Sequence, residues 1–267
     1  MNKKDEIADI NERHWEKMVK EGCGFTRPWL DLDFALVRQY AEGELESVPE
    51  QLIEIYPTTV LADVEDKDVL CLASGGGQQS AVFGLLGARV TVVDLTEGQL
   101  DGDRRAAAHY GYEVATIRAD MRDLSCIGDE SFDLVYGEGM CYVPDVRQVY
   151  SEVARVLRTR GPYRVGATNP ATEFVDTDSW DGEGYRITVP YAVRRVENDG
   201  EGPVEFRHYW DDIFNGLLAV GLSIQEVHDD PRCLQHNAQA RPGSWEHMLA
   251  HVQWGLAIVA RKEQRAF

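Results

Sequence analysis

The sequence lacks the clustered positive charge that nucleic-acid-binding and membrane-surface proteins carry. Its 27 lysines and arginines are outnumbered by 46 aspartates and glutamates, and the formal net charge is −19. Because a surface that neutralises phosphates needs clustered lysine and arginine, we expect neither nucleic acid nor an anionic membrane as a partner. No run approaches the roughly 18 consecutive apolar residues of a membrane span. The polar stretch MNKKDEIADINERHWEKM does not resemble a signal peptide.

Cysteine is scarce and shows no pattern. The five cysteines form no CxxC pair, and several lie inside apolar runs, where a free thiol behaves as a small hydrophobic group. Reduced thiols are typical of the cytosol, so we predict a cytoplasmic location. His228, Cys233 and His236 come nearest to a set of metal ligands, but their spacing matches no standard site. We therefore predict no metal.

What the sequence does contain is a regular alternation of apolar and amphipathic stretches. The apolar runs that predict buried strands are DVLCLA (68–73), RVTVVDL (89–95), EVATIRAD (113–120), SFDLVYGEG (131–139) and PYRVGATN (162–169). Helical patterns separate them at intervals of about 10 to 15 residues, which is typical of βαβ units. We therefore predict an α/β fold with a Rossmann-like, doubly wound sheet that is mostly parallel.

Two segments fall outside this alternation. Residues 1–60 precede the first predicted strand, and we expect them to form an N-terminal helical cap on a Rossmann-like domain of residues 61–267. Within that domain, residues 170–206 are rich in Asp, Glu, Gly and Tyr. Because long insertions in compact domains are usually functional, we predict that this one is a lid. The sequence leaves open whether the cap packs across the interface of a homo-oligomer.

The ends of the predicted strands suggest a nucleoside site. In an open α/β sheet, ligands bind beyond the carboxyl ends of the strands, and Asp94, Asp120 and Glu138 follow three of them. Asp94 comes about 20 residues after the glycines of the first turn, the spacing of an acid that bonds ribose hydroxyls. We expect an adenine ring to donate its amino group to Asp120 and to stack near Met121. Glycine in the first turn lets the backbone approach the ligand closely.

Three blocks along these strands carry a family resemblance. LASGGGQQS (72–80), ADM (119–121) and YVPDV (142–146) resemble the class I S-adenosylmethionine-dependent methyltransferases, and among them a bacterial small-molecule branch. The resemblance covers Val69 to Asn169. It implies S-adenosylmethionine as the cofactor. It also implies that the last two apolar runs of the chain end the sheet as an antiparallel hairpin.

The resemblance assigns residues to the cofactor. It implies that the glycine turn packs against the methionine portion, that Asp94 binds the ribose, and that Asp120 and Met121 bind the adenine. With Trp15 closing over the cofactor, the expected cofactor set is Trp15, Ala73, Gly75, Gly77, Gln78, Asp94, Leu95, Gln99, Asp120, Met121, Gly137 and Glu138.

The sequence departs from the common family pattern at the first turn. Counted from Val69, the pattern has an acid at the third position and glycine at the fifth, where this chain has Cys71 and Ala73. The usual acid orders the loop and balances the positive methionine end. We expect Glu138 to take over that role, so that Glu138→Gln weakens cofactor binding at least as much as Cys71→Ser does.

These observations predict methyl transfer to a small-molecule nucleophile, with nitrogen or oxygen favoured, by in-line displacement. His208 is the expected general base, and Tyr142 and Glu138 are expected beside the substrate. Two alternatives remain. The partial glycine fingerprint also suits an NAD(P)-dependent oxidoreductase, although no Tyr-x-x-x-Lys pair accompanies it, and the same site suits a non-catalytic S-adenosylmethionine-binding module.

Overall fold

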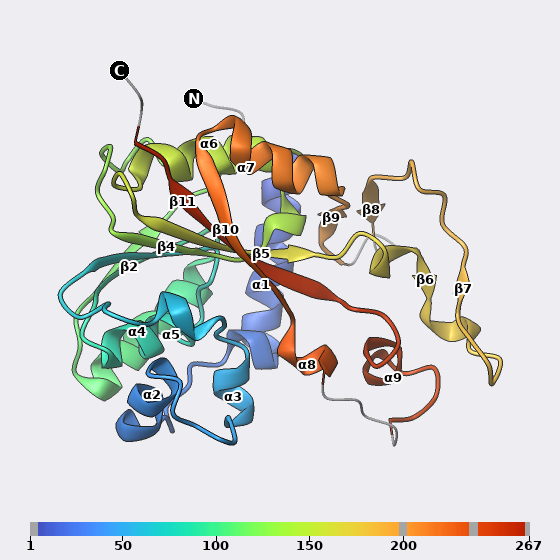
Figure 1. Ribbon diagram of the computed structural model, residues 1–267, viewed down its shortest axis with the longest axis horizontal. Coiled ribbons are helices and arrows are strands. Elements are labelled where there is room, and N and C mark those ends of the chain that lie inside the picture. The colour runs from blue at the N-terminus through green and yellow to red at the C-terminus, as the bar shows by residue number, and fades with distance from the viewer. Residues whose placement is uncertain (1–4, 198–201, 235–239, 265–267) are drawn as a thin grey trace.

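The computed structural model describes residues 5–197, 202–234 and 240–264, which form a seven-stranded sheet with helices on both faces (Figure 1). The strand order is β10-β11-β5-β4-β1-β2-β3. The strands are β1 (Asp68–Leu72), β2 (Arg89–Asp94), β3 (Val114–Arg118), β4 (Leu134–Gly137), β5 (Pro162–Thr168), β10 (Leu222–Asp229) and β11 (Gly255–Lys262). Strands β1 to β5 pair in parallel, and β11 is antiparallel to both β5 and β10. The predicted fold, including the antiparallel hairpin at its end, is confirmed.

Each face of the sheet has its own layer of helices and its own hydrophobic core. Helices α6 (Val146–Val156) and α7 (Gly216–Ala219) lie over one face, and α4 (Gln79–Leu85) and α5 (Glu97–Tyr110) lie over the other (Figure 1). The sequence of α6 shows why it packs this way, since its buried residues recur at helical spacing. They are Val146, Val149, Tyr150, Val153 and Val156.

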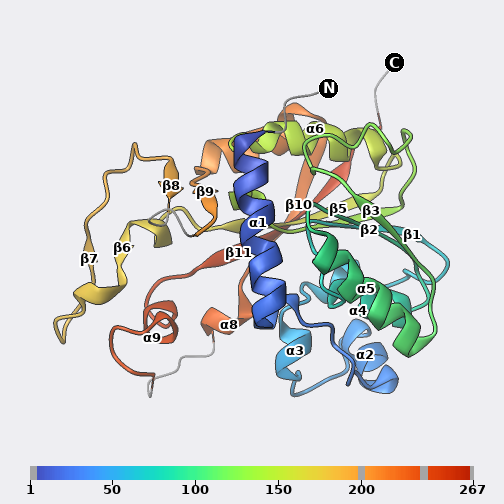
Figure 2. The same ribbon diagram turned by 180° about the vertical axis from the view of Figure 1, so that it is seen from behind.

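The N-terminal segment contains α1 (Glu6–Glu21), α2 (Phe34–Ala41) and α3 (Glu50–Ile53). Buried residues of α2 and α3 join the same core as α4, so these helices complete the layer below the sheet. Helix α1 is separate from that core. Figure 2 shows it lying between α5 and the inserted segment, and it contacts both α5 and β9 (Val204–Phe206). The predicted division of the chain at residue 60 stays a prediction.

The segment that breaks the alternation extends beyond the main sheet as two small antiparallel ribbons. Strands β6 (Val175–Asp176) and β7 (Arg186–Ile187) form one ribbon, and β8 (Arg195–Glu197) pairs with β9 to form the other (Figure 1). The connection between β10 and β11 carries α8 (Pro231–Leu234) and α9 (Trp245–Leu249). Within the described ranges, no helix has the length and apolar character that a membrane crossing requires.

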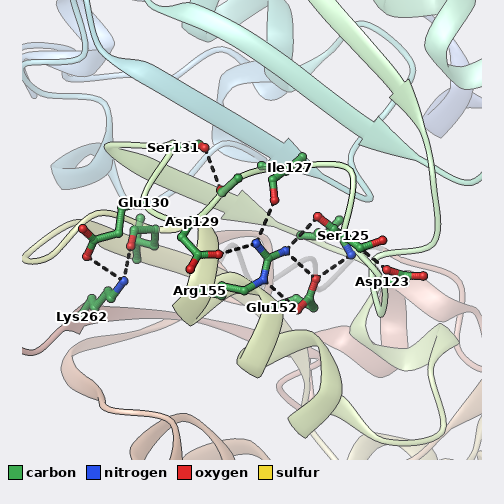
Figure 3. A network of polar contacts seen from close by, with 12 residues as sticks. Asp123, Ser125, Ile127, Asp129, Glu130, Ser131, Glu152, Arg155 and Lys262 are labelled. Atoms are coloured by element: carbon green, nitrogen blue, oxygen red, sulfur yellow. Dashed lines mark hydrogen bonds and ion pairs between the residues drawn. The ribbon is translucent and has the colours of Figure 1, made fainter.

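A polar network fixes the connection between β3 and β4 (Figure 3). Arg155 on α6 donates to the carbonyls of Leu124 and Ile127, each at 2.8 Å. Its partner on the same helix, Glu152, accepts from the backbone N–H of Leu124 at 2.7 Å. Because this connection begins just after β3, the network also anchors the strand end that carries Asp120.

Candidate active site

A cavity of about 770 Å³ opens at the carboxyl ends of the parallel strands. Most of the expected cofactor set lines it, namely Trp15, Ala73, Gly75, Gln78, Asp94, Leu95, Gln99, Asp120, Met121 and Glu138. Gly77 and Gly137 are not among the described residues of its wall. Other parts of the wall come from the N-terminal segment, the turn after β4, β5, the inserted segment and the connection between β10 and β11. Residues from distant parts of the sequence therefore meet at one edge of the sheet.

The glycine bend after β1 is shaped by close approach to neighbouring groups. A Cβ at Gly75 would lie 2.9 Å from a carboxylate oxygen of Asp94. A Cβ at Gly77 would lie 2.5 Å from the carbonyl oxygen of Gly102, and Gly77 has a φ of +81°. Glycine at 77 is thus required for packing against α5, and the expected contact of Gly77 with the cofactor stays a prediction.

The acid that orders this bend is Asp103, on α5. Its carboxylate accepts from the backbone N–H of Gly76 at 3.1 Å, from that of Gly77 at 3.0 Å, and from the Ser80 hydroxyl at 2.5 Å. Asp103 is fully buried, and burial raises its pKa to about 7 despite these hydrogen bonds. The Asp103 carboxylate therefore orders the glycine bend from the side of α5.

Sequence reasoning missed Asp103 because it lies in a polar helical stretch, EGQLDGDRR, whose composition is typical of a solvated face. One signal was present. Gly98 and Gly102 stand inside the helix, where glycine is unfavourable unless another backbone comes close. A Cβ at Gly102 would lie 2.7 Å from the carbonyl oxygen of Gly76, so the helix does approach the bend.

The expected loop-ordering role of Glu138 is wrong. The Glu138 carboxylate pairs with Nη1 of Arg164, a fully buried residue of β5. Arg164 is held in turn by the carbonyl of Tyr56 at 2.9 Å and lies 4.4 Å from the ring centre of Tyr136. The amides of the glycine bend are bonded by Asp94 and Asp103 instead. Glu138 does line the cavity, so a role beside the cofactor or substrate stays a prediction.

Asp94 ends β2 with both carboxylate oxygens engaged. One accepts from the backbone N–H of Gly75 at 3.1 Å and the other from that of Thr96 at 2.9 Å. Burial raises the pKa of Asp94, and these hydrogen bonds offset part of that shift. Because each carboxylate oxygen can accept more than one hydrogen bond, Asp94 can still bind a diol in the cavity.

The chemistry of the wall fits an adenosyl group. The Asp94 carboxylate lies at the end of β2 and keeps acceptor capacity for ribose hydroxyls. Met121, in the same wall, offers an apolar side chain against which a base can pack. The Oε1 atoms of Gln79 and Gln99 have no hydrogen-bond partner among the described residues, but the protein itself covers them, so they do not face a ligand in the cavity.

Comparison with known proteins identifies the family. Residues 70–165 match the model of the methyltransferase domain. The chain is also 30% identical over 232 residues to the uncharacterized methyltransferase YbaJ of Bacillus subtilis, an alignment that covers 82% of this chain and 89% of YbaJ. The chain belongs to the S-adenosylmethionine-dependent methyltransferase family.

Solved structures share the fold of this methyltransferase. An S-adenosylmethionine-dependent methyltransferase from Mesorhizobium loti has a TM-score of 0.61 at 24% identity, covering 78% of this chain and 94% of that one. The 1,6-didemethyltoxoflavin-N1-methyltransferase of Burkholderia thailandensis has a TM-score of 0.59 at 17% identity, covering 99% of this chain and 92% of that one. At such identities the likeness extends to the fold alone.

Two residues of the expected cofactor set also form hydrogen bonds or ion pairs within the methyltransferase itself. The carboxylate of Asp120 is paired with Arg122 at 2.6 Å, and Arg122 also pairs with Asp5 at the start of α1, again at 2.6 Å. The side-chain amide of Gln78 donates to the carbonyls of Gly24 and Arg27 at 2.9 and 3.1 Å. These residues fasten the N-terminal segment over the site, in addition to lining it.

The structure does not bring His208 to the cavity. Its Nε2 lies 3.0 Å from the carbonyl oxygen of Met140, and the ring is buried outside the described wall. Burial lowers its pKa. The geometry does not support the expected role of His208 as general base. Tyr142, by contrast, lines the cavity and packs edge-on against Trp15, with ring centres 5.7 Å apart.

The sequence analysis also missed the charged residues that the later segments bring to the cavity. Glu173, Glu205 and Arg207 come from the inserted segment and the chain just after it. A second group surrounds Arg232, which pairs with Asp230 at 2.6 Å and with Glu54 at 3.3 Å.

The residues that come nearest to a set of metal ligands in the sequence are His228, Cys233 and His236. His236 lies outside the described residues, and His228 pairs with Glu226 at 2.7 Å. In the part of the chain that the structure describes, no cluster of three His, Cys, Asp or Glu side chains is placed to hold a metal ion.

Proposed function

We propose that this methyltransferase transfers a methyl group from S-adenosylmethionine to a nitrogen or oxygen atom of a small molecule. The observation that carries the proposal is the cavity. Its volume of about 770 Å³ falls within the range of small-molecule sites, and its walls are assembled from α1, the strand ends and the inserted segment. The Burkholderia enzyme, which was solved with bound 1,6-didemethyltoxoflavin and S-adenosylhomocysteine, supports a small-molecule substrate here.

In this proposal the cofactor lies along the strand ends. Gly75 and Ala73 leave room for the methionine portion, Asp94 accepts from the ribose hydroxyls, and Met121 packs on the adenine. Trp15 covers the site from α1. The inserted segment at residues 170–206 acts as the lid over the substrate.

The protein acts mainly by aligning the cofactor and the substrate, and less by supplying reactive groups. The cofactor brings a methyl group that is already activated as a sulfonium, so holding the nucleophile in line contributes most of the acceleration. Excluding water and fixing both reactants are the tasks of the walls. The lid and the turn that carries Tyr142 are the elements that position the nucleophile.

Calorimetry with S-adenosylhomocysteine, S-adenosylmethionine and NAD tests the cofactor. We expect the first two to bind and NAD not to bind. Asp94→Asn is expected to weaken S-adenosylhomocysteine binding about tenfold or more, because a charged acceptor of hydrogen bonds is lost. Glu113→Gln, at an exposed carboxylate far from the wall, is the matched control. Equal affinities of Asp94→Asn and the control would contradict the assignment.

Turnover separates an enzyme from a binding module. Radiolabelled methyl groups should pass from S-adenosylmethionine to members of a panel of small amines and alcohols. Binding of the cofactor without transfer to any of them would favour the non-catalytic alternative.

A further inference from the structure

The inserted segment brings two carboxylates to the wall of the cavity. Glu173 lies in the turn after β5, and Glu205 is the central residue of β9. Both line the cavity, as does Tyr142. The Tyr142 hydroxyl lies beside the Glu205 carboxylate and favours its charged form, which lowers the pKa of Glu205. A strand of the lid and the turn after β4 thus meet at one carboxylate.

A clamp on α1 holds this carboxylate in place. The side-chain amide of Asn11 donates to the carbonyl of Val204 at 3.1 Å, and its oxygen accepts from the backbone N–H of Val204 at 2.7 Å. The same amide nitrogen lies 3.3 Å from the carbonyl oxygen of Tyr142. Asn11 is 3% exposed. Because one buried side chain bonds both segments, Glu205 is positioned against Tyr142 by α1.

The charge balance of the wall singles out Glu205. Each arginine of the wall has a carboxylate within 4 Å, and the pairs are Arg122 with Asp120, Arg164 with Glu138, Arg207 with Glu173 and Arg232 with Asp230. Two carboxylates among the described residues of the wall form no ion pair with these arginines. They are Glu205 and Asp94. Asp94 is already engaged by the glycine bend, whereas the neighbour of Glu205 is a neutral tyrosine hydroxyl.

The surroundings of Glu205 favour a positive partner. Burial raises the pKa of Glu205, and the neighbouring Glu173 raises it further, while the Tyr142 hydroxyl lowers it. Arg207 stands beside Glu173, 3.8 Å from its carboxylate. A cation placed between these groups would relieve the repulsion between the two carboxylates, whereas an anion would increase it. The aromatic ring of Tyr142, with Trp15 against it, adds attraction for a cation.

We propose that Glu205 binds the substrate's nucleophile as an amine, with Tyr142 and Glu173 beside it, and that its carboxylate accepts the proton that the amine must lose. The inference rests on the proposed function, and it restricts the atom that receives the methyl group to nitrogen. One N–H proton of the ammonium passes to the carboxylate, and the nitrogen lone pair becomes available. In the transfer that follows, a C–N bond forms, a C–S bond breaks with its electron pair remaining on sulfur, and the carboxyl proton leaves to water.

A matched trio of probes tests the proposal by binding rather than turnover. Phenethylamine, 2-phenylethanol and 3-phenylpropionate are titrated into the complex of the full chain with S-adenosylhomocysteine, with detection by ligand-observed NMR. We expect the amine to bind in preference to the alcohol and the acid. In Glu205→Gln, which keeps the shape and polarity of the side chain but removes its charge, affinity for the amine should fall about 10- to 100-fold, as expected for a lost charged hydrogen bond.

Two controls separate the possible failures. Glu183→Gln changes an exposed carboxylate of the same inserted segment and should leave binding of the amine unchanged. Calorimetry with S-adenosylhomocysteine on each variant reports the cofactor site independently. If the cofactor analogue does not bind, the proposed function fails. If it binds but the protein shows no preference for the amine, or if Glu205→Gln keeps that preference, the assignment of Glu205 is overturned.

Discussion

Asp103→Asn tests how the glycine bend is held. The wild-type carboxylate accepts three hydrogen bonds, two from backbone N–H groups and one from a hydroxyl. Asparagine offers one oxygen and one amide nitrogen, so in either orientation at least one buried donor loses its acceptor. A buried donor without a partner costs about 1–3 kcal/mol. We expect the free energy of unfolding to fall by about that amount, a large part of a typical total of about 5–15 kcal/mol.

Urea denaturation followed by tryptophan fluorescence measures this loss, and calorimetry with S-adenosylhomocysteine measures its effect on the site. Because the bend forms part of the cofactor wall, a loosened bend should also reduce affinity for the cofactor analogue about tenfold. The matched control is Asp101→Asn on the same helix, where the side chain is 64% exposed and pairs with Arg104. An exposed pair of this kind contributes about 1 kcal/mol or less. If both variants unfold at the same urea concentration, Asp103 does not order the bend.

Three further outcomes follow from the structure. Glu138→Gln leaves buried Arg164 without its anionic partner, and urea denaturation should show a loss of about 1–3 kcal/mol; unchanged stability would contradict the pairing. Gly77→Ala should cost more stability than Gly111→Ala, because both have positive φ but only the first meets backbone within 3 Å, and equal thermal midpoints would count against this. Burial lowers the pKa of His208, so below the unfolded pKa the unfolded chain binds more protons and stability falls on acidification. His208→Gln should reduce this loss of stability between about pH 8 and about pH 5.5, as measured by urea denaturation of both proteins at each pH. An identical loss in the two proteins would refute a lowered pKa of His208 as its cause.

The features that the sequence predicted correctly are local. Apolar runs with β-branched residues at β1 and β2, and the helical spacing of α6, are set by residues within a few positions of one another. Asp94 could be placed at the cavity because the carboxyl ends of parallel strands meet at the same edge of a sheet, whatever the details of packing.

The features that the sequence did not predict depend on contacts between distant segments. His208 looked like a base because it precedes a helix, yet its ring turns toward a backbone carbonyl of the β4 turn. Glu138 was predicted to replace the missing acid because it follows a strand end, yet its carboxylate forms an ion pair with a buried arginine of β5.

The sequence by itself determined the α/β sheet and the edge at which a nucleoside cofactor would lie. Hydrophobic periodicity is set by residues close together in the chain, and the parallel topology brings the carboxyl ends of the strands to one edge. Only the tertiary structure decided which acids work there. Asp103 reaches the glycine bend because Gly102, its neighbour on α5, lets the backbone of the bend come close, and Glu205 reaches the cavity because Asn11 fastens β9 to α1. Such pairings depend on where side chains point after packing, and no pattern along the chain encodes that direction.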